Sequence, residues 1–198
     1  ILIILFSLCN FNFKHMGIYF AKYKLVIRFI VLFLFTYALL SIAYKYYLEF
    51  STGFRYFPDY ATNLVAQHCD NLINLLGYQS SIVPHESEAS LKLIIEGTYT
   101  ARIVEGCNSI SILILFTSFI VAFADNIQST SMFIIAGSIL IYSMNILRIV
   151  LITLAIYHYP AHHEILHTIV FPLIIYGMVF LLWVMWVRRL NMINKRNE

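Results

Sequence analysis

Three residues with the chemistry of thiol catalysis occur at separate points of this 198-residue chain: Cys107, Arg148 and His167. An imidazole can remove the proton of a thiol, and the resulting thiolate attacks a carbonyl carbon to form an acyl intermediate. A guanidinium beside that carbon stabilises the negative charge that develops on the carbonyl oxygen. Because the three residues are far apart in the sequence, this chemistry depends on elements that bring them together.

The composition indicates what kind of elements these are. Hydrophobic residues make up 61% of the chain and charged residues 12%, whereas an average soluble domain has roughly 45–50% and about 25%. A soluble domain of this length would leave much of its apolar side chain on the surface. The same numbers exclude a disordered chain, and a net charge of +3 is too small to indicate a nucleic-acid partner. The sequence therefore predicts an all-α integral membrane protein in a lipid bilayer.

Four apolar stretches predict about four transmembrane helices, since each span needs about 20 residues. The predicted spans are residues 25–44, 108–124, 131–151 and 168–187. The apolar run at residues 1–8 is too short to span and lacks the pattern of a signal peptide. Met16 is a more natural start, so we expect residues 1–15 to be a non-native or mis-assigned leader. Residues 16–198 are expected to form a single membrane domain.

The charge distribution predicts the orientation of these spans. The loop between the first and second spans, residues 45–106, has four basic and seven acidic residues, whereas the chain ends are basic. The positive-inside rule then places both termini in the cytoplasm and the loop outside. The basic residues that support this are Lys14, Lys22, Lys24 and Arg28 before or within the first span, and Arg188, Arg189, Lys195 and Arg196 after the fourth.

The external loop is predicted to be ordered. Pro58-Asp59 and Gly77 are typical of a helix start and stop, and the apolar spacing between them predicts an amphipathic helix on the membrane face. The stretch from 80 to 90 is expected to be a polar turn. Residues 91–96 and 99–104 flank Gly97-Thr98, which predicts a small β-hairpin. Its second strand leads directly to Cys107.

These elements bring the three reactive residues to the outer membrane face. Cys107 lies at the outer start of the second span, and His167 begins the fourth. Arg148 lies about 17 residues into the third span, roughly 26 Å from its cytoplasmic end. An arginine within a membrane helix is costly and by default marks a functional site. The alternative is structural: Cys107 packs, His167 lies at the interface, and Arg148 extends outward or neutralises Glu105 or Glu164.

Two further interpretations share these residues. Residues 163–167 match the H-E-x-x-H pattern of zinc proteases, but downstream of His167 only Glu198 offers a ligand, and it lies on the other side of the membrane. A solvated histidine-rich loop explains the same residues, and we predict neither a metal nor a cofactor. Cys69 is also external, where disulfides form. A Cys69–Cys107 bridge would make Cys107 structural, whereas a simple packed or exposed thiol at Cys69 leaves it free.

Three segments resemble the cysteine, arginine and histidine motifs of the exosortase/archaeosortase family. They are ARIVEGCNSISILILF around Cys107, NILRIVL around Arg148, and HEILHTIVFPLIIYG around His167. The resemblance extends from about Lys22 to Arg189 and is closest to the F-type exosortases of Bacteroidota. Each motif falls at a span boundary, in the same order as in the family. Many members have Cys-Ser-Gly where this chain has Cys107-Asn108-Ser109, which leaves open the signal that it recognises.

The resemblance implies a multi-pass cysteine transpeptidase or protease of the bacterial cytoplasmic membrane, with its active site on the periplasmic face. Its partners are exported proteins with a C-terminal sorting signal, which consists of a short motif, a transmembrane helix and a basic cluster. By this resemblance, Cys107 is the nucleophile that forms the acyl-enzyme, Arg148 stabilises the oxyanion and His167 is the acid/base.

Two supporting residues and one alternative class complete the sequence-based hypothesis. Asn145, one turn before Arg148, is a candidate to orient the guanidinium, and Glu105 is a candidate to adjust the surroundings of Cys107. The alternative is a non-catalytic membrane assembly factor, in which Arg148 pairs structurally and Cys107 is inert.

Overall fold

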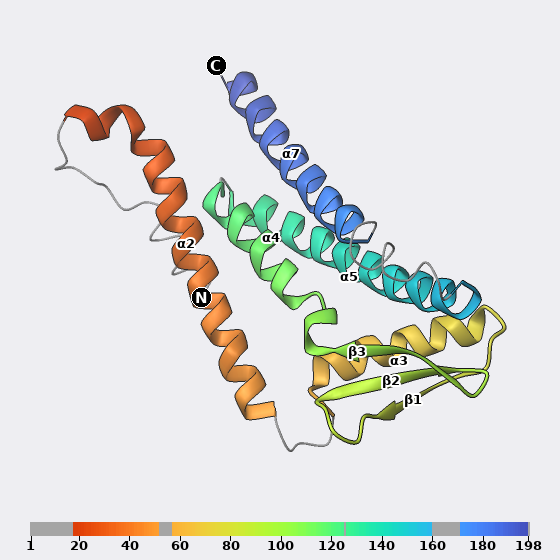
Figure 1. Cartoon of the computed structure of the whole chain (residues 1–198). Coiled ribbons are helices and arrows are strands. Elements are labelled where there is room, and N and C mark those ends of the chain that lie inside the picture. The colour runs from red at the N-terminus through yellow and green to blue at the C-terminus, as the bar shows by residue number, and fades with distance from the viewer. Residues whose placement is uncertain (1–17, 52–56, 125, 160–170, 198) are drawn as a thin grey trace. The chain divides into compact units, whose positions relative to one another are not determined.

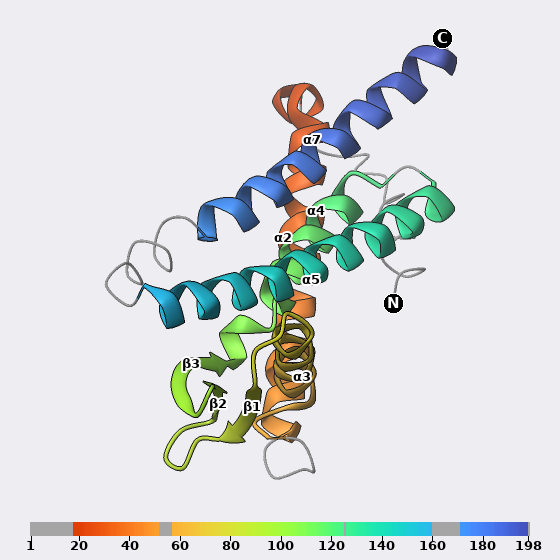
Figure 2. The ribbon, with the colours of Figure 1, turned by 90° about the vertical axis from the view of Figure 1, so that its right-hand side faces the viewer.

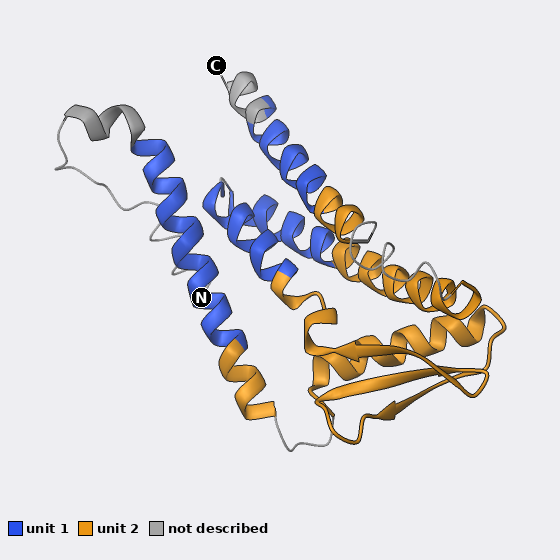
Figure 3. Cartoon of the chain, in the orientation of Figure 1, with its two compact units in different colours: residues 1–44, 112–138, 179–198 blue, residues 45–111, 139–178 orange. Residues whose placement is uncertain are grey.

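The computed structural model describes residues 18–51, 57–124, 126–159 and 171–197 (Figure 1). The chain divides into two compact units, shown in different colours in Figure 3. Unit 1 contains residues 1–44, 112–138 and 179–198, and unit 2 contains residues 45–111 and 139–178. The predicted leader, residues 1–15, lies outside the described residues and stays a prediction. The prediction of a single membrane domain over residues 16–198 also stays a prediction.

Long apolar helices account for most of the described chain. They are α2 (Ile18–Ser51), α5 (Ile127–His158) and α7 (Phe171–Asn197), together with the shorter α4 (Ile110–Ala122). Within the described ranges, three segments are long and apolar enough to cross a membrane: 24–51, 127–158 and 172–190. The 13 residues of α4 extend about 20 Å, less than the roughly 30 Å of a bilayer core. The fourth span and the cytoplasmic termini stay predictions.

Aromatic side chains hold the helices of unit 1 together. The ring of Phe29 on α2 lies 4.4 Å from that of Phe123, and the ring of Phe119 on α4 stacks on Trp183 of α7 at 4.4 Å between centroids. Trp186 of α7 packs against Phe133 of α5 at 4.8 Å. Without a hydrophobic driving force in lipid, membrane helices associate through such close packing.

Unit 2 contains an antiparallel sheet of order β1-β2-β3, formed by Ser80–Pro84, Ser90–Ile95 and Thr98–Val104. The hairpin of β2 and β3 confirms the predicted one, but its turn is Glu96-Gly97, one residue earlier than expected, because Thr98 pairs with Ile95. Both turn residues have positive φ, 49° and 75°, as the favoured two-residue hairpin turn requires.

Strand β1 corrects the expectation that residues 80–90 form a polar turn. Ser80–Pro84 pairs in register with residues 91–95 of β2, and the side chain of Ile82 packs against the core. Serine, proline and acidic neighbours gave this stretch a turn-like composition. An edge strand tolerates such residues, because one side of its backbone needs no partner and a terminal proline costs no ladder bond.

Helix α3 (Tyr60–Leu75) begins and ends where the sequence predicted. Asp59 caps it by accepting from the backbone N–H groups of Ala61 and Thr62 at 2.9 and 3.1 Å, and Gly77 follows its end with φ of 95°. The apolar spacing that predicted a membrane-facing surface included Val65, which is instead buried in the core. Figures 1 and 2 show α3 along one face of the sheet. Its buried residues are Thr62, Val65, Ala66, Cys69 and Ile73.

Helix α5 completes the core of unit 2. Its residues Ile146, Ile149 and Val150 are buried in one cluster with the inner faces of α3, β2 and β3. A hydrogen bond at the edge of this core also links α3 to α5, since His68 Nδ1 lies 2.7 Å from the hydroxyl of Tyr142 on α5. The sheet, α3 and the second half of α5 therefore form one core. Cys107 lies at the edge of this core, between β3 and α4.

Candidate active site

Cys107 ends a short turn between the sheet and α4. Strand β3 ends at Val104, and η1 (Glu105–Cys107), a single turn of 3-10 helix, follows without a break. The predicted strand leading into Cys107 is therefore confirmed. The Cys107 side chain is half-buried and packs against the core of unit 2. Its backbone carbonyl accepts a hydrogen bond of 2.7 Å from the side-chain amide of Asn145 on α5.

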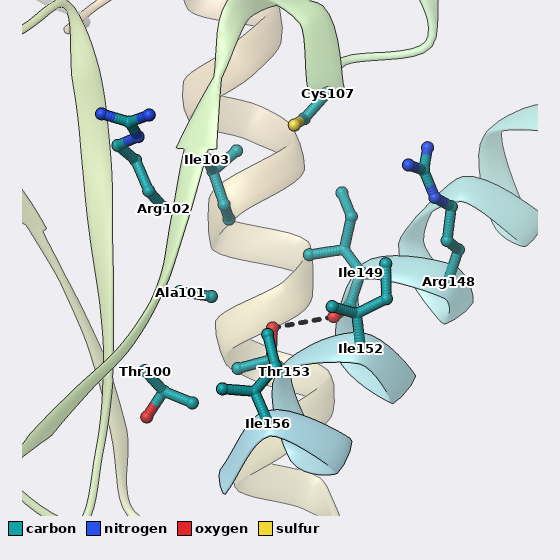
Figure 4. A pocket seen from close by; sticks show the side chains of 10 residues that line it. All are labelled: Thr100, Ala101, Arg102, Ile103, Cys107, Arg148, Ile149, Ile152, Thr153 and Ile156. Carbon is teal, nitrogen blue, oxygen red and sulfur yellow. Dashed lines mark hydrogen bonds between the residues drawn. The ribbon is translucent and has the colours of Figure 1, made fainter. Parts of the chain in front are cut away.

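The structure brings Cys107 and Arg148 to the same pocket, which has a volume of about 420 Å³. Figure 4 shows Cys107 from η1 and Arg148 from α5 at one end of it, and isoleucines of α5 farther along. The Arg148 Nε atom is buried and has no hydrogen-bond partner within the described part of the chain. A buried donor without a partner is costly in a folded protein.

Asn145 lies one turn before Arg148 and is 1% exposed. The sequence suggested that it orients the guanidinium, and that role stays a prediction. The bond that the structure shows goes to the Cys107 carbonyl instead. Helix α5, which carries Arg148, therefore also holds the η1 turn that carries the Cys107 thiol.

Glu105 shares the turn with Cys107. Its side chain is half-buried, and this burial, reinforced by the negative charge of Asp59, raises the pKa of the Glu105 carboxyl above its ordinary value. Both causes disfavour the ionised form. Glu105 therefore keeps its proton to higher pH than an exposed glutamate.

Asn108 and Ser109 have structural roles that sequence reasoning missed. The Asn108 amide donates to the Thr62 hydroxyl at 3.2 Å, and its oxygen accepts from the backbone N–H of Ile110 at 3.0 Å. It therefore caps α4 and ties the Cys107 turn to α3. Ser109 is buried with φ of 63°, a left-handed conformation that favours glycine. The sequence offered one signal for these roles: Asn108 and Ser109 stand where many exosortases have serine and glycine after the cysteine.

Cys69 has a different environment from Cys107. Cys69 is fully buried in the core, and both Cys69 and Cys107 are free thiols. Burial raises the pKa of the Cys69 thiol to about 12, so that this thiol stays protonated at physiological pH. Of the alternatives for Cys69, the structure has the packed thiol rather than a bridge.

His167 lies outside the described residues, as do Glu164 and the rest of the H-E-x-x-H segment. Its assignment as acid/base and the zinc alternative therefore stay predictions. In the parts of the chain that the structure describes, no group of three or more histidine, cysteine, aspartate or glutamate side chains is placed to hold a metal ion.

Comparison with known families agrees with this architecture. The family model of the transmembrane exosortases matches residues 19–187, which is most of the chain. The chain therefore belongs to the transmembrane exosortase family. No match was found among curated proteins or among solved structures. Exosortases process exported proteins that carry sorting signals, and the family is generally one of cysteine transpeptidases.

Proposed function

We propose that this protein is a membrane cysteine transpeptidase or peptidase that cleaves C-terminal sorting signals of exported proteins. We place it among the F-type exosortases, in the bacterial cytoplasmic membrane with its site on the periplasmic face. One observation carries the proposal: Cys107 and Arg148, distant in sequence, line the same pocket. The family assignment supplies the class of substrate.

The proposed reaction proceeds in two steps. His167 takes the Cys107 proton, and the thiolate attacks the scissile carbonyl to form a tetrahedral intermediate. When the C–N bond breaks, the leaving amine receives the proton from His167 and a thioester remains on Cys107. Water or an amine then attacks this thioester, and the Cys107 thiol is regenerated.

Arg148 is proposed to stabilise the oxyanion in both steps. Its side chain lines the pocket of Cys107, where the negative charge would develop, and its buried Nε–H is without a partner in the described residues. A preorganised donor of this kind costs no reorganisation when the charge appears. Glu105 and Asn145 are proposed as positioning residues, with Asn145 acting on the Cys107 turn through the bond described above.

The membrane supplies part of the substrate binding. A sorting signal with its own transmembrane helix is held in the same bilayer as the enzyme. Once the substrate helix is in the bilayer, the binding of its cleavage site to the pocket is effectively intramolecular, so a small pocket suffices.

The test compares the two cysteines of unit 2. The probe is a reporter protein fused to a C-terminal sorting signal from the same genome, comprising a short motif, a transmembrane helix and a basic cluster. Cys107→Ala should reduce reporter processing by about 10³-fold or more, as expected when a covalent nucleophile is lost. Cys69→Ala is the matched control and should retain processing.

Two further readouts make the test decisive. The wild-type protein should carry a reporter-derived thioester on Cys107, detected by mass spectrometry and released by hydroxylamine. Membrane abundance of each variant is measured by immunoblot. Processing by Cys107→Ala at normal abundance would overturn the cysteine mechanism and favour a non-catalytic assembly factor.

A further inference from the structure

The pocket at Cys107 continues along strand β3. Four consecutive residues of that strand, Thr100 to Ile103, line it (Figure 4). Successive side chains of a strand point to opposite faces, so a pocket on one face of a sheet contacts only every second residue. Lining by four residues in a row is what a pocket that runs along the edge of the strand, beside its backbone, produces.

This edge of β3 has no partner strand in the described part of the chain. The sheet order is β1-β2-β3, so β3 pairs with β2 on one side only. The two faces of β3 are already occupied near the pocket: Ile103 is buried in the core, and the Arg102 guanidinium binds the carboxylate of Glu88. What β3 offers to the pocket is therefore mainly its unpaired backbone.

Helix α5 forms the opposite wall, and that wall is apolar. Ile149, Ile152 and Ile156 line the pocket, while the hydroxyl of Thr153 is satisfied by the Ile149 carbonyl at 2.8 Å. From Arg148 to Ile156 the helix extends about 12 Å at 1.5 Å per residue. From Thr100 to Ile103 the strand extends about 10 Å at roughly 3.3 Å per residue. The two walls thus match an extended peptide of three or four residues.

We infer that the substrate residues preceding the scissile bond bind as an added strand on the free edge of β3. The inference rests on the proposed function and specifies how that site recognises its substrate. Backbone hydrogen bonds to β3 would hold the peptide, and every second side chain would lie against the isoleucines of α5. This mode favours apolar residues at alternate positions of the signal and tolerates variety between them.

The direction of the added strand follows from the chemistry. The carbonyl attacked by Cys107 belongs to the last acyl-side residue, so the preceding residues extend from Cys107 toward Thr100. The peptide therefore runs from Thr100 to Cys107, parallel to β3. The residues after the scissile bond lead to the substrate's own membrane helix and lie outside this pocket.

A β-bulge marks the far end of this edge. Ile94 pairs with Tyr99 and Leu93 with Ala101, which leaves Thr100 as the extra residue. Bulges interrupt pairing and are common beside active sites and on sheet edges. Strand addition is therefore confined to the segment between Thr100 and the end of β3 at Val104, just before the Cys107 turn.

The first test uses a photo-cross-linker at the two edges of the sheet. p-Benzoylphenylalanine replaces Thr100 beside the pocket or, as the matched control, Val83 on the opposite edge strand β1. Both are made in the full-length Cys107→Ala protein in membranes, with the sorting-signal reporter as probe. The Thr100 position should cross-link to reporter residues preceding the cleavage site, and the Val83 position should not. Equal labelling of both positions, or labelling of neither, would overturn strand addition.

The second test leaves the enzyme unchanged. Proline is placed in the reporter, one position at a time, over the four residues preceding the cleavage site. Because a strand directs its N–H groups alternately to each side, loss of processing by the wild-type enzyme should alternate from residue to residue. A loss without alternation would contradict the inference. Failure of the proposed function is distinguished separately, since processing by Cys107→Ala would overturn that function whatever the proline pattern.

Discussion

The two units of this exosortase differ in how their elements are held together. In unit 1 the helices meet through aromatic rings, such as Phe119 stacked on Trp183. In unit 2, directional hydrogen bonds link elements that are distant in sequence, such as those of Asn145 to Cys107 and of Asn108 to Thr62. Ring packing holds helices in lipid without fixing a reactive atom, whereas hydrogen bonds fix both distance and direction. Substitutions in the ring packing of unit 1 should therefore change the amount of folded protein, whereas substitutions that remove hydrogen bonds at the Cys107 turn of unit 2 should change the chemistry.

After the loss of Cys107, the largest effect on activity is expected at Arg148. Arg148→Gln should reduce reporter processing by about 10²–10³-fold, the loss typical of an oxyanion donor. Arg148→Lys should restore little, because an ammonium lacks the planar fork of the guanidinium. Processing rates normalised to immunoblotted membrane abundance measure both. Activity near wild type in Arg148→Gln would assign the arginine a structural role.

A pair of helix glycines tests the packing of unit 1. A Cβ at Gly137 of α5 would lie 2.4 Å from the ring of Phe116, whereas a Cβ at Gly177 of α7, in unit 2, would have nothing within 4 Å. Gly137→Ala should therefore be less stable than Gly177→Ala by about 1–3 kcal/mol, the usual cost of overpacking. Thermal unfolding in detergent measures the difference, and processing per folded molecule should be unchanged in both. Equal melting temperatures would show that the ring moves aside without cost.

Asn145 tests whether the turn must be anchored. Asn145→Ala removes the bond to the Cys107 carbonyl, a loss of about 1 kcal/mol, so processing should fall roughly tenfold or less. Because the acyl-enzyme forms on a displaced thiol, the decrease should appear in the rate of thioester formation. Gln67→Ala, at an exposed side chain of α3, is the control. A change in abundance without any change in thioester formation would contradict a positioning role.

The smallest effect is expected at Ser109, and it is stabilising. Ser109→Gly relieves a left-handed backbone at φ of 63° and should raise stability by up to about 1 kcal/mol. Ser81→Gly in the extended strand β1 is the matched control and should lower stability. Melting temperatures of the two variants are compared with wild type. If Ser109→Gly melts below wild type, the lost hydroxyl bond to the Asn108 carbonyl, 2.6 Å in the structure, outweighs the backbone relief.

Local signals in the sequence predicted much of this architecture. The α3 boundaries followed from Asp59 and Gly77, and apolar runs located the three long helices. The strand that leads to Cys107 followed from the hairpin signal at Gly97-Thr98. Span order and helix rise predicted that Cys107 and Arg148 lie near each other, while the predicted approach of His167 falls outside the described residues.

The remaining features depend on tertiary contacts that no local pattern contains. Val65 of α3 was expected on a membrane-facing surface, because burial against a sheet and burial against lipid select the same apolar spacing. Strand β1 was missed because its stability comes from β2 rather than from its own residues. The role of Asn108 and the left-handed backbone of Ser109 are set by side chains and turns that meet only in the folded chain.

The bond from Asn145 to the Cys107 carbonyl has a mechanical consequence. Membrane helices tilt as bilayer thickness changes, and such tilting would separate reactive groups carried on independent helices. Here the thiol-bearing turn is suspended from α5, three residues before the arginine on the same helix. When α5 tilts, the Cys107 turn and Arg148 should therefore move together. A change in bilayer thickness should then leave the separation of Cys107 and Arg148 unaltered and act on the arrival of the substrate helix.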